Sequence, residues 1–208
     1  MRILTLPVGP LQTNCYLIGC PATGQAAAID PGWSGADIFQ AAQDAGLTLT
    51  HMLLTHAHFD HVGGAAELSA LSAAQLLVHP DAAPSLARAH LEAEWWGLKL
   101  PAAPEPDAYL ADGQTVTIGT LQIQVLDTPG HAPGHVSFYH AESQSAFDGD
   151  VLFSGGIGRT DLPGGNYPQL MRSIRDRLLL LPDETTLYPG HGPSTTVGDE
   201  RRYNPFLR

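Results

Sequence analysis

The chain is poor in cysteine and in basic residues, and each shortage argues against a class of protein. Two cysteines among 208 residues cannot form the disulfide framework of a small secreted protein. We therefore expect Cys15 and Cys20 to be reduced thiols. Ten lysines and arginines stand against 21 aspartates and glutamates, which gives a formal charge of −11. This acidity argues against nucleic acid as a partner, because such binding depends on a basic surface.

Long apolar runs are also absent from the chain. No stretch approaches the roughly 18 apolar residues of a membrane-spanning helix. Residues 1–6 begin a strand-like stretch without the pattern of a signal peptide. We therefore expect a cytoplasmic location and no membrane partner. Hydrophobic residues make up 43% of the chain and charged residues 15%, so the composition fits one globular domain spanning residues 1–208.

Hydrophobic periodicity predicts strands and helices in both halves of the chain. One helix is expected to begin after Ser34, a residue type that caps helices, and to end before Gly46. Two more helices are expected over about 62–74 and over 167–181. Strands are predicted at residues 3–8, 15–19, 25–30, 51–55, 115–126 (with a turn at Gly119), 136–140 and 146–151. Two β-rich halves with helices between them predict an α/β fold in which two sheets pack face to face under outer helices.

Residues 80–110 interrupt this alternation of strands and helices. They read as helical over 82–96 and as a proline-rich stretch after that. We expect this excursion either to overhang a site, with Trp95 and Trp96 as an apolar wall, or to pack its aromatic side chains against the domain.

The densest group of chemically active side chains lies at residues 56–61, which read His-Ala-His-Phe-Asp-His. This segment lies in a turn between a predicted strand and a predicted helix. Imidazole and carboxylate groups bind zinc, iron and manganese at neutral pH. Residues two apart in an extended turn point the same way, so His56 and His58 can hold one ion, while Asp60 and His61 can face a second. As ordinary core groups, the four side chains would each need a separate buried partner.

Three further ligand candidates share one local pattern. His131, Asp150 and His191 each follow a strand-like segment and a turn that has glycine directly before the donor residue. Glycine at that position lets the backbone come close to a metal ion. Together with residues 56–61, they place seven donors on loops after four strands, where ligand sites of sheet proteins gather.

As a set, these segments resemble the metallo-β-lactamase superfamily, and specifically its glyoxalase II-like branch. The matching segments are Thr55–His61, Pro129–His131, Gly149–Asp150 and Pro189–His191, which occur in the family's order across nearly the whole chain. The resemblance implies the metallo-β-lactamase fold, a four-layer αβ/βα sandwich with a two-metal site. It implies that one ion is bound by His56, His58 and His131, that the other is bound by Asp60, His61 and His191, and that Asp150 bridges them.

The resemblance also ranks the competing donors. It assigns the metal to His131 and not to His135, which we interpret as structural or as a partner of a ligand. It assigns the bridging position to Asp150 and not to the nearby Asp148. The other histidines lack partners at ligand spacing and are expected to have structural or surface roles.

The chemistry implied by the resemblance is hydrolysis by a hydroxide held between two metal ions. Coordination lowers the pKa of water from about 15.7 towards 7, and the metals stabilise the oxyanion formed on the attacked carbonyl. A thioester releases a thiolate whose thiol has a pKa of about 8.5, so little acid assistance is needed. Asp60, which could accept a proton from the nucleophile, and the bridging Asp150 are the catalytic candidates. Zinc is the expected metal, with iron or manganese as alternatives.

Arg159 is the candidate residue for substrate binding. It lies in a glycine-rich turn after Asp150. In glyoxalase II-like enzymes the basic residue after this turn contacts the glutathione part of the substrate, and a guanidinium group pairs bidentately with a carboxylate. The expected partner is thus a small-molecule thioester, such as one derived from glutathione. The alternative role of Arg159 is a structural ion pair with Asp161.

The chain departs from full glyoxalase II proteins after His191. Those proteins carry a helical C-terminal domain with further basic contacts to glutathione, whereas 17 residues follow His191 here. We therefore expect a single metallo-β-lactamase-type hydrolase domain, residues 1–208, without that helical domain. The substrate does not follow from the resemblance alone.

Two alternatives to the hydrolase stay open. Persulfide dioxygenases share the His-x-His-x-Asp-His motif and a Gly-Arg-Thr-Asp segment like residues 158–161, yet they use one iron and molecular oxygen. The surroundings of His191, Pro-Gly-His-Gly-Pro, favour the hydrolase. A non-catalytic metal-binding protein would tolerate loss of second-site donors, and all seven donors are present.

Overall fold

Two six-stranded sheets form the centre of the computed structural model, which describes residues 1–208. The first sheet contains, in order across the sheet, β1 (Arg2–Val8), β2 (Thr13–Gly19), β3 (Gln25–Ile29), β4 (Thr48–Leu53), β5 (Gln75–Val78) and β6 (Ala108–Tyr109). The second contains β14 (Thr195–Thr196), β13 (Thr186–Pro189), β10 (Ser145–Gly149), β9 (Val136–His140), β8 (Leu121–Asp127) and β7 (Thr115–Ile118). A separate ribbon is formed by β11 (Leu152–Phe153) and β12 (Gly156–Ile157).

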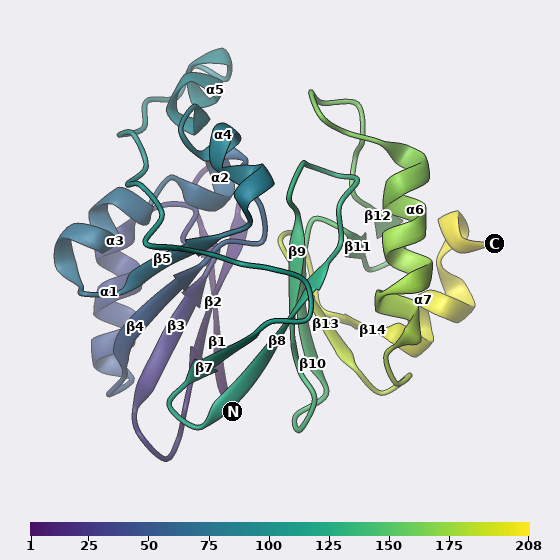
Figure 1. Cartoon of the computed structure of the whole chain (residues 1–208), viewed down its shortest axis with the longest axis horizontal. Coiled ribbons are helices and arrows are strands. Elements are labelled where there is room, and N and C mark those ends of the chain that lie inside the picture. Colours follow the sequence, from purple (N-terminus) through teal and green to yellow (C-terminus); the bar gives the residue numbers. More distant parts are fainter.

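The helices cover the outer faces of the two sheets. The α-helices are α1 (Gly35–Asp44), α2 (Phe59–Val62), α3 (Ala65–Leu71), α4 (Ala83–Leu86), α5 (Ala89–Trp95), α6 (Tyr167–Asp176) and α7 (Val197–Tyr203). Short 3₁₀ helices are η1 (Pro80–Ala82), η2 (Leu178–Leu180) and η3 (Pro205–Leu207). Helices α1 and α3 lie outside the first sheet, and α6 and α7 lie outside the second (Figure 1). The predicted four-layer αβ/βα sandwich is therefore confirmed. No helix is long and apolar enough to cross a membrane.

Three apolar clusters fill the spaces between these four layers. The middle cluster, between the sheets, includes Tyr16, Ile18, Phe138 and Phe147, which are all buried. The alternating side chains of the same strand β2, such as Leu17, belong instead to the cluster under α1 and α3. This period of two explains why every residue of β2 is buried, since both faces of the strand are covered. A third cluster packs α6 against the second sheet.

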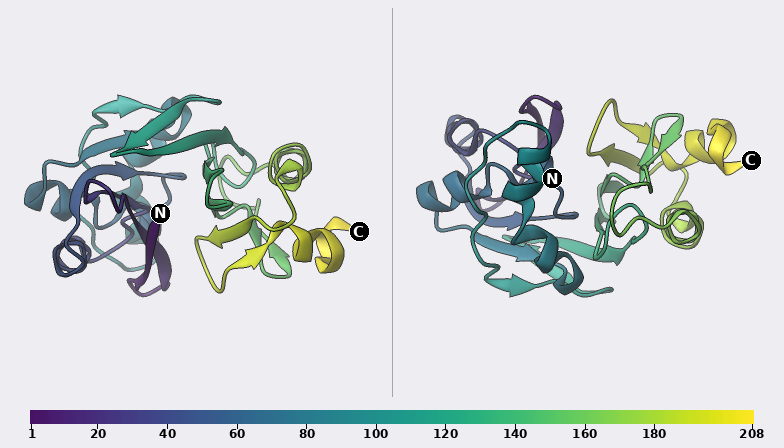
Figure 2. Two further views of the ribbon diagram at one scale, coloured as in Figure 1. Left: turned by 90° about the horizontal axis from the view of Figure 1, so that it is seen from below. Right: turned by 90° about the horizontal axis from the view of Figure 1, so that it is seen from above.

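Parallel pairing brings several strand ends to one edge of the molecule. Strands β3 and β4 run parallel in the first sheet, and β10 and β13 run parallel in the second. Backbone hydrogen bonds join the two halves at this edge, from Asn14 N to Gly190 O (2.7 Å) and from Val136 N to Thr55 O (2.8 Å). Figure 2 shows the two sheets facing each other from above and from below. The loops after these strands therefore meet across the junction between the sheets.

Several predicted element boundaries are wrong. The helix expected over 62–74 ends at Leu71, because the chain must turn to enter β5, a strand that the periodicity did not predict. The helix expected over 167–181 ends at Asp176, and the one expected over 82–96 is divided into η1, α4 and α5. Ser34 precedes α1 in a left-handed conformation (φ 48°) and makes no side-chain capping bond. The hairpin with its turn at Gly119 is present as β7 and β8. Both cysteines are buried free thiols.

Candidate metal centre

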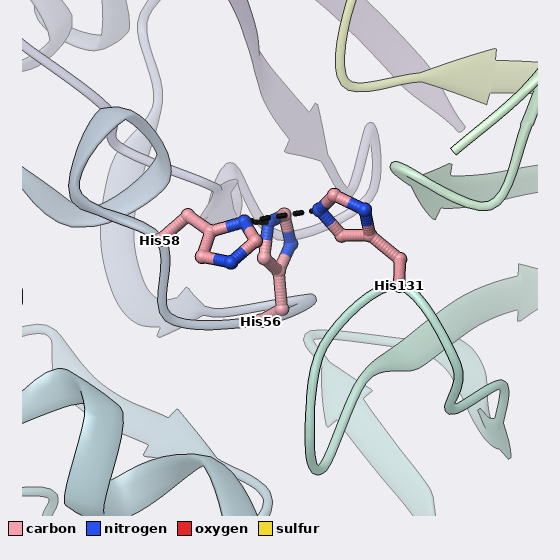
Figure 3. Close-up of side chains that lie close together, drawn as sticks. All are labelled: His56, His58 and His131. Carbon is pink, nitrogen blue, oxygen red and sulfur yellow. Dashed lines mark hydrogen bonds between the residues drawn. The ribbon is translucent and has the colours of Figure 1, made fainter. Parts of the chain in front are cut away.

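The seven predicted donors come together at the edge where the sheets meet. His56 and His58 lie in the turn between β4 and α2, Asp60 and His61 lie in α2, and the other three follow strands of the second sheet. In the first group, His58 Nδ1 lies 3.1 Å from His56 Nε2 and 3.0 Å from His131 Nε2. Figure 3 shows these three rings pointing toward one another from two separate loops. The three nitrogens lie close enough to share one ion.

A second group of donors lies beside the first. Asp60 Oδ2 is 3.2 Å from His191 Nε2 and 3.6 Å from His61 Nε2. Asp150 lies between the groups: its Oδ1 is 3.5 Å from His61 Nε2, and its Oδ2 is 3.6 Å from His131 Nε2. The structure thus places the carboxylate of Asp150 within reach of both groups.

The donor spacing and two orphaned atoms fit a pair of divalent ions. Zinc–nitrogen bonds of 2.0–2.1 Å in tetrahedral geometry place donors about 3.3 Å apart, close to the separations within each group. His61 Nε2 and Asp150 Oδ1 are buried and have no hydrogen-bond partner. Such atoms cost free energy unless something binds them. A mixed imidazole and carboxylate set suits zinc, iron or manganese.

Local backbone structure explains how the donors approach one another. His58 is extended (φ −66°, ψ 147°) and directly precedes α2, so the chain turns between His58 and Asp60 and divides the motif between the two groups. Gly190 is held by a backbone bond from its N–H to Gly149 O (2.7 Å). A Cβ atom on Gly190 would collide with the Asp150 carboxylate and the His61 ring. This contact explains the glycine before His191.

Residues that the sequence did not single out orient the donors. Buried Asp30 accepts hydrogen bonds from Thr55 N (2.7 Å), from Thr55 Oγ1 (2.6 Å) and from His61 Nδ1 (2.9 Å). The bond from His61 Nδ1 to Asp30 leaves the other ring nitrogen, His61 Nε2, facing the site. Thr13 Oγ1 donates to Asp60 Oδ2 (2.9 Å). One signal in the sequence was available, because Asp30 follows β3 just as the predicted donors follow their strands.

Electrostatics divide the donors into neutral and charged groups. Burial lowers the pKa of His56 well below its ordinary value and lowers that of His58 to about 4, so both rings are neutral. Burial opposes ionisation of Asp60, yet the neighbouring His61 and His191 lower its pKa to about 2. Burial also works against a charge on His61, but Asp60 and Asp150 raise its pKa well above the ordinary value. A metal ion bound at His61 would displace that proton.

His135 and Asp148 lie outside both donor groups. His135 Nε2 accepts the backbone N–H of Asp150 (3.2 Å), and its Nδ1 lies 3.1 Å from Thr128 Oγ1. It therefore holds the backbone of a donor residue, which agrees with the interpretation of His135 as a structural partner. Asp148 is fully buried and accepts the N–H of Leu152 (3.3 Å). Burial raises the pKa of Asp148 well above its ordinary value.

The donors open into a cavity of about 430 Å³. Its walls include Glu92 of α5 and Trp96 directly after that helix, so part of segment 80–110 does overhang the site. Arg159 lies on this cavity, and its carbonyl oxygen accepts a hydrogen bond from His131 Nδ1 (2.8 Å). The guanidinium makes two bonds of 2.7 Å to Asp161, so the ion pair with that residue is present. Both side chains are exposed.

Comparison with known proteins agrees with this geometry. The family model described as "Metallo-beta-lactamase superfamily" matches residues 8–191. Hydroxyacylglutathione hydrolase GloC of Haemophilus influenzae is 40% identical, over 100% of this chain and 98% of the relative. A solved structure of TTHA1623 in a di-iron-bound form is 44% identical with a TM-score of 0.91, over 98% of this chain and 100% of that one. ETHE1 from Myxococcus xanthus is 33% identical with a TM-score of 0.84, over 100% and 84%. The chain belongs to the metallo-beta-lactamase superfamily, whose members bind divalent metals, often two, and are mostly hydrolases.

Proposed function

We propose that this protein is a two-metal thioesterase that hydrolyses acyl thioesters, with acyl-glutathione as the first substrate class to test. One ion would be held by His56, His58 and His131, the other by Asp60, His61 and His191, with Asp150 bridging. Zinc is the proposed metal, although the di-iron form of the TTHA1623 structure shows that a similar chain accepts iron. We further propose that residues 1–208 act as one domain in the cytoplasm.

One observation carries the two-metal proposal. The second donor group has three donors like the first, and both His61 Nε2 in that group and Asp150 Oδ1 beside it are buried without a hydrogen-bond partner. A protein that used a single ion at the three-histidine group would have no use for these orphaned atoms. The 40% identity to a protein named hydroxyacylglutathione hydrolase supports a thioester as the substrate.

The residues of the chain prepare the site for hydrolysis. Ions held by these donors would supply an activated water at neutral pH and positive charge opposite a developing oxyanion. Asp30 fixes the tautomer of His61 by accepting from Nδ1, and the Arg159 carbonyl does the same for His131. A thiolate can leave without protonation, so a thioester would need little acid assistance from the site.

Substrate orientation is assigned to the guanidinium of Arg159. Arg159 lines the site cavity, and its exposed guanidinium would pair with a carboxylate of the thiol part of the substrate. Its bidentate pair with Asp161 holds the side chain in place, yet both residues are exposed, so the pair is accessible to an incoming anion. The ion pair and the substrate contact are therefore compatible.

A mono-iron, persulfide dioxygenase-like reaction is the second candidate. The resemblance of segment 158–161 to those enzymes and the similarity to the ETHE1 structure favour it. Metal analysis of the purified protein, combined with hydrolysis of S-lactoylglutathione and other acyl thioesters, separates the two. Two ions per chain and thioester hydrolysis are expected. One iron per chain with oxygen uptake on glutathione persulfide would replace the thioesterase with the dioxygenase.

A further inference from the structure

A second cavity, of about 560 Å³, lies directly beside the site cavity. Both cavities are lined by His58 and by Glu92. Neighbouring residues of the same segments line the two cavities in turn. Leu162 lines the site cavity and Pro163 the second one, and Trp96 and Trp95 are divided in the same way. The two spaces therefore form one groove that passes the three-histidine group.

The lining of the second cavity differs from that of the first. It contains no predicted donor except His58, and most of its walls are apolar, formed by Ala57, Leu91, Trp95, Ala132, Pro133 and Pro163. Its charged residues are one arginine, Arg88, and two glutamates, Glu92 and Glu94. These charges give no net attraction for an anionic thiol such as glutathione. The chemistry of the walls suits an uncharged apolar group instead.

The exposure of Trp95 indicates that the second cavity is a ligand-binding surface and not a gap in the core. The Trp95 side chain is 76% exposed, and Leu91, one helical turn earlier on α5, is 45% exposed. Large apolar side chains gathered on the wall of a cavity beside a reactive site are typical of a ligand-binding surface. Figure 1 shows α4 and α5 at the end of the molecule where the loops carrying the donors lie.

We propose that the cavity between α5 and the 132–133 and 163 turns is an acyl pocket, which selects thioesters with apolar acyl groups larger than lactoyl. This inference rests on the proposed thioesterase function. The thiol part would lie toward Arg159 on the site cavity, and the scissile carbonyl would lie near the donors. The acyl chain would then extend past His58 into the second cavity. A volume of about 560 Å³ lies within the range that holds drug-sized ligands, and a lactoyl group would leave most of it unfilled.

The test measures kcat/KM of the metal-loaded enzyme on acetyl-, butyryl- and hexanoyl-glutathione. Each added methylene is expected to raise kcat/KM by about two- to fourfold, as its apolar surface leaves water. Replacing Trp95 with alanine is expected to lower the hexanoyl-to-acetyl ratio by about fivefold or more, and Leu91→Ser is expected to act in the same direction. Leu180→Ala is the matched control, because Leu180 is 77% exposed on η2 and lies in neither cavity.

Four outcomes are distinguishable. A rising series that Trp95→Ala flattens supports the acyl pocket, whereas a flat series overturns it and leaves the thioesterase proposal intact. Equal losses on acetyl and hexanoyl substrates in Trp95→Ala would place the thiol part in this cavity and also overturn the pocket. Absence of hydrolysis on every thioester refutes the proposed function. In that case, the binding of S-hexylglutathione against S-methylglutathione by calorimetry still decides the pocket: tighter hexyl binding that is lost in Trp95→Ala supports it, and equal binding overturns it.

Discussion

Asp30 shows how much of the candidate centre depends on a residue that is not itself a predicted donor. Its buried carboxylate accepts three hydrogen bonds, two from Thr55 and one from His61 Nδ1. The bond to His61 decides which ring nitrogen faces the site, and the bonds to Thr55 fix the start of the motif turn. Asp30 adopts a left-handed conformation (φ 50°). The chain therefore bends sharply at the end of β3, and the Asp30 carboxylate points toward the turn that begins at Thr55.

Asp30→Asn is expected to weaken metal binding at the second group more than at the first. An amide has one acceptor oxygen for donors that now share a carboxylate, so at least one of them loses its partner. We expect affinity for the second ion to fall by about 10- to 100-fold, with hydrolysis falling in parallel. Metal titration by calorimetry measures this loss. The control is Asp44→Asn, because Asp44 is exposed at the end of α1. Equal weakening of both ions would contradict a specific link to His61.

Arg159 offers a second prediction at this scale. Arg159→Gln is expected to raise KM for a glutathione thioester by about three- to tenfold while kcat changes little, since the contact would be equal in ground and transition states. Asp161→Asn is expected to lower KM, because it frees the guanidinium from its present partner. Steady-state kinetics on acyl-N-acetylcysteamine, an uncharged thioester, provide the comparison. If each variant changes KM on that uncharged substrate as much as on the glutathione thioester, Arg159 does not bind the carboxylate of the thiol part.

The spacing of donors was predictable from the sequence, whereas their supports were not. Four metal-binding side chains within residues 56–61 indicate a metal site, because few other roles would place so many of them in one short buried segment. The partner of His61 lies 31 residues away along the chain, and only the parallel pairing of β3 with β4 brings it close. Thr13 and Asp60, which are hydrogen-bonded, are also far apart along the chain, with a separation of 47 residues. Hydrophobic periodicity carries no information on such contacts.

At the scale of elements, helix α7 anchors the glycine-rich turn that leads to Arg159. Buried Glu200 on α7 accepts hydrogen bonds from Gly155 N (3.0 Å), from Thr195 Oγ1 (2.6 Å) and from Asn204 Nδ2 (2.7 Å). Asn204 also donates to Gly156 O (3.0 Å). The short segment after His191 therefore has a structural task that its sequence did not reveal, because α7 is too short to show a helical period.

Glu200→Ala is expected to destabilise the protein by about 2–3 kcal/mol, since three donors lose their acceptor in a buried position. Hydrogen exchange is expected to rise at Gly155 and Gly156 before it rises in the sheets. Urea denaturation and exchange mass spectrometry measure the two effects. Glu184→Ala is the control, because that side chain is exposed just before β13. Unchanged exchange in the turn would show that α7 does not hold it.

Prediction of elements failed where tertiary structure overrides local pattern. The apolar residues of 62–74 continue a helical pattern, but β5 needs residues 75–78 to pair with β4, and so α3 stops early. The segment 82–96 breaks into three short pieces, although its composition favours one helix. The layers themselves followed from the alternation in strands such as β8, because one buried face per strand requires a second layer.

At the scale of the whole molecule, the candidate centre joins two halves that each have their own sheet. Four donors come from the turn after β4 of the first sheet and from the short helix α2 that follows it, and three follow strands of the second sheet. Two backbone hydrogen bonds, from Asn14 N and Val136 N, also cross at this edge. Ions bound here would connect the halves where His61 Nε2 and Asp150 Oδ1 otherwise lack a hydrogen-bond partner.

Removal of the metals is therefore expected to lower the stability of the whole fold. A ligand that binds only the folded state adds about 4 kcal/mol when its free concentration is 1,000-fold above Kd. For a chain of this size each kcal/mol shifts Tm by about 2–4 °C. We expect Tm in scanning calorimetry to fall by roughly 8–16 °C for each ion removed by chelation and to recover when zinc is restored. The control is an Asp150→Asn variant, whose Tm is expected to respond far less to chelator because the bridge is lost. A parent protein that keeps its Tm after verified loss of both ions would show that the inter-sheet core and the backbone hydrogen bonds hold its two halves together without the ions.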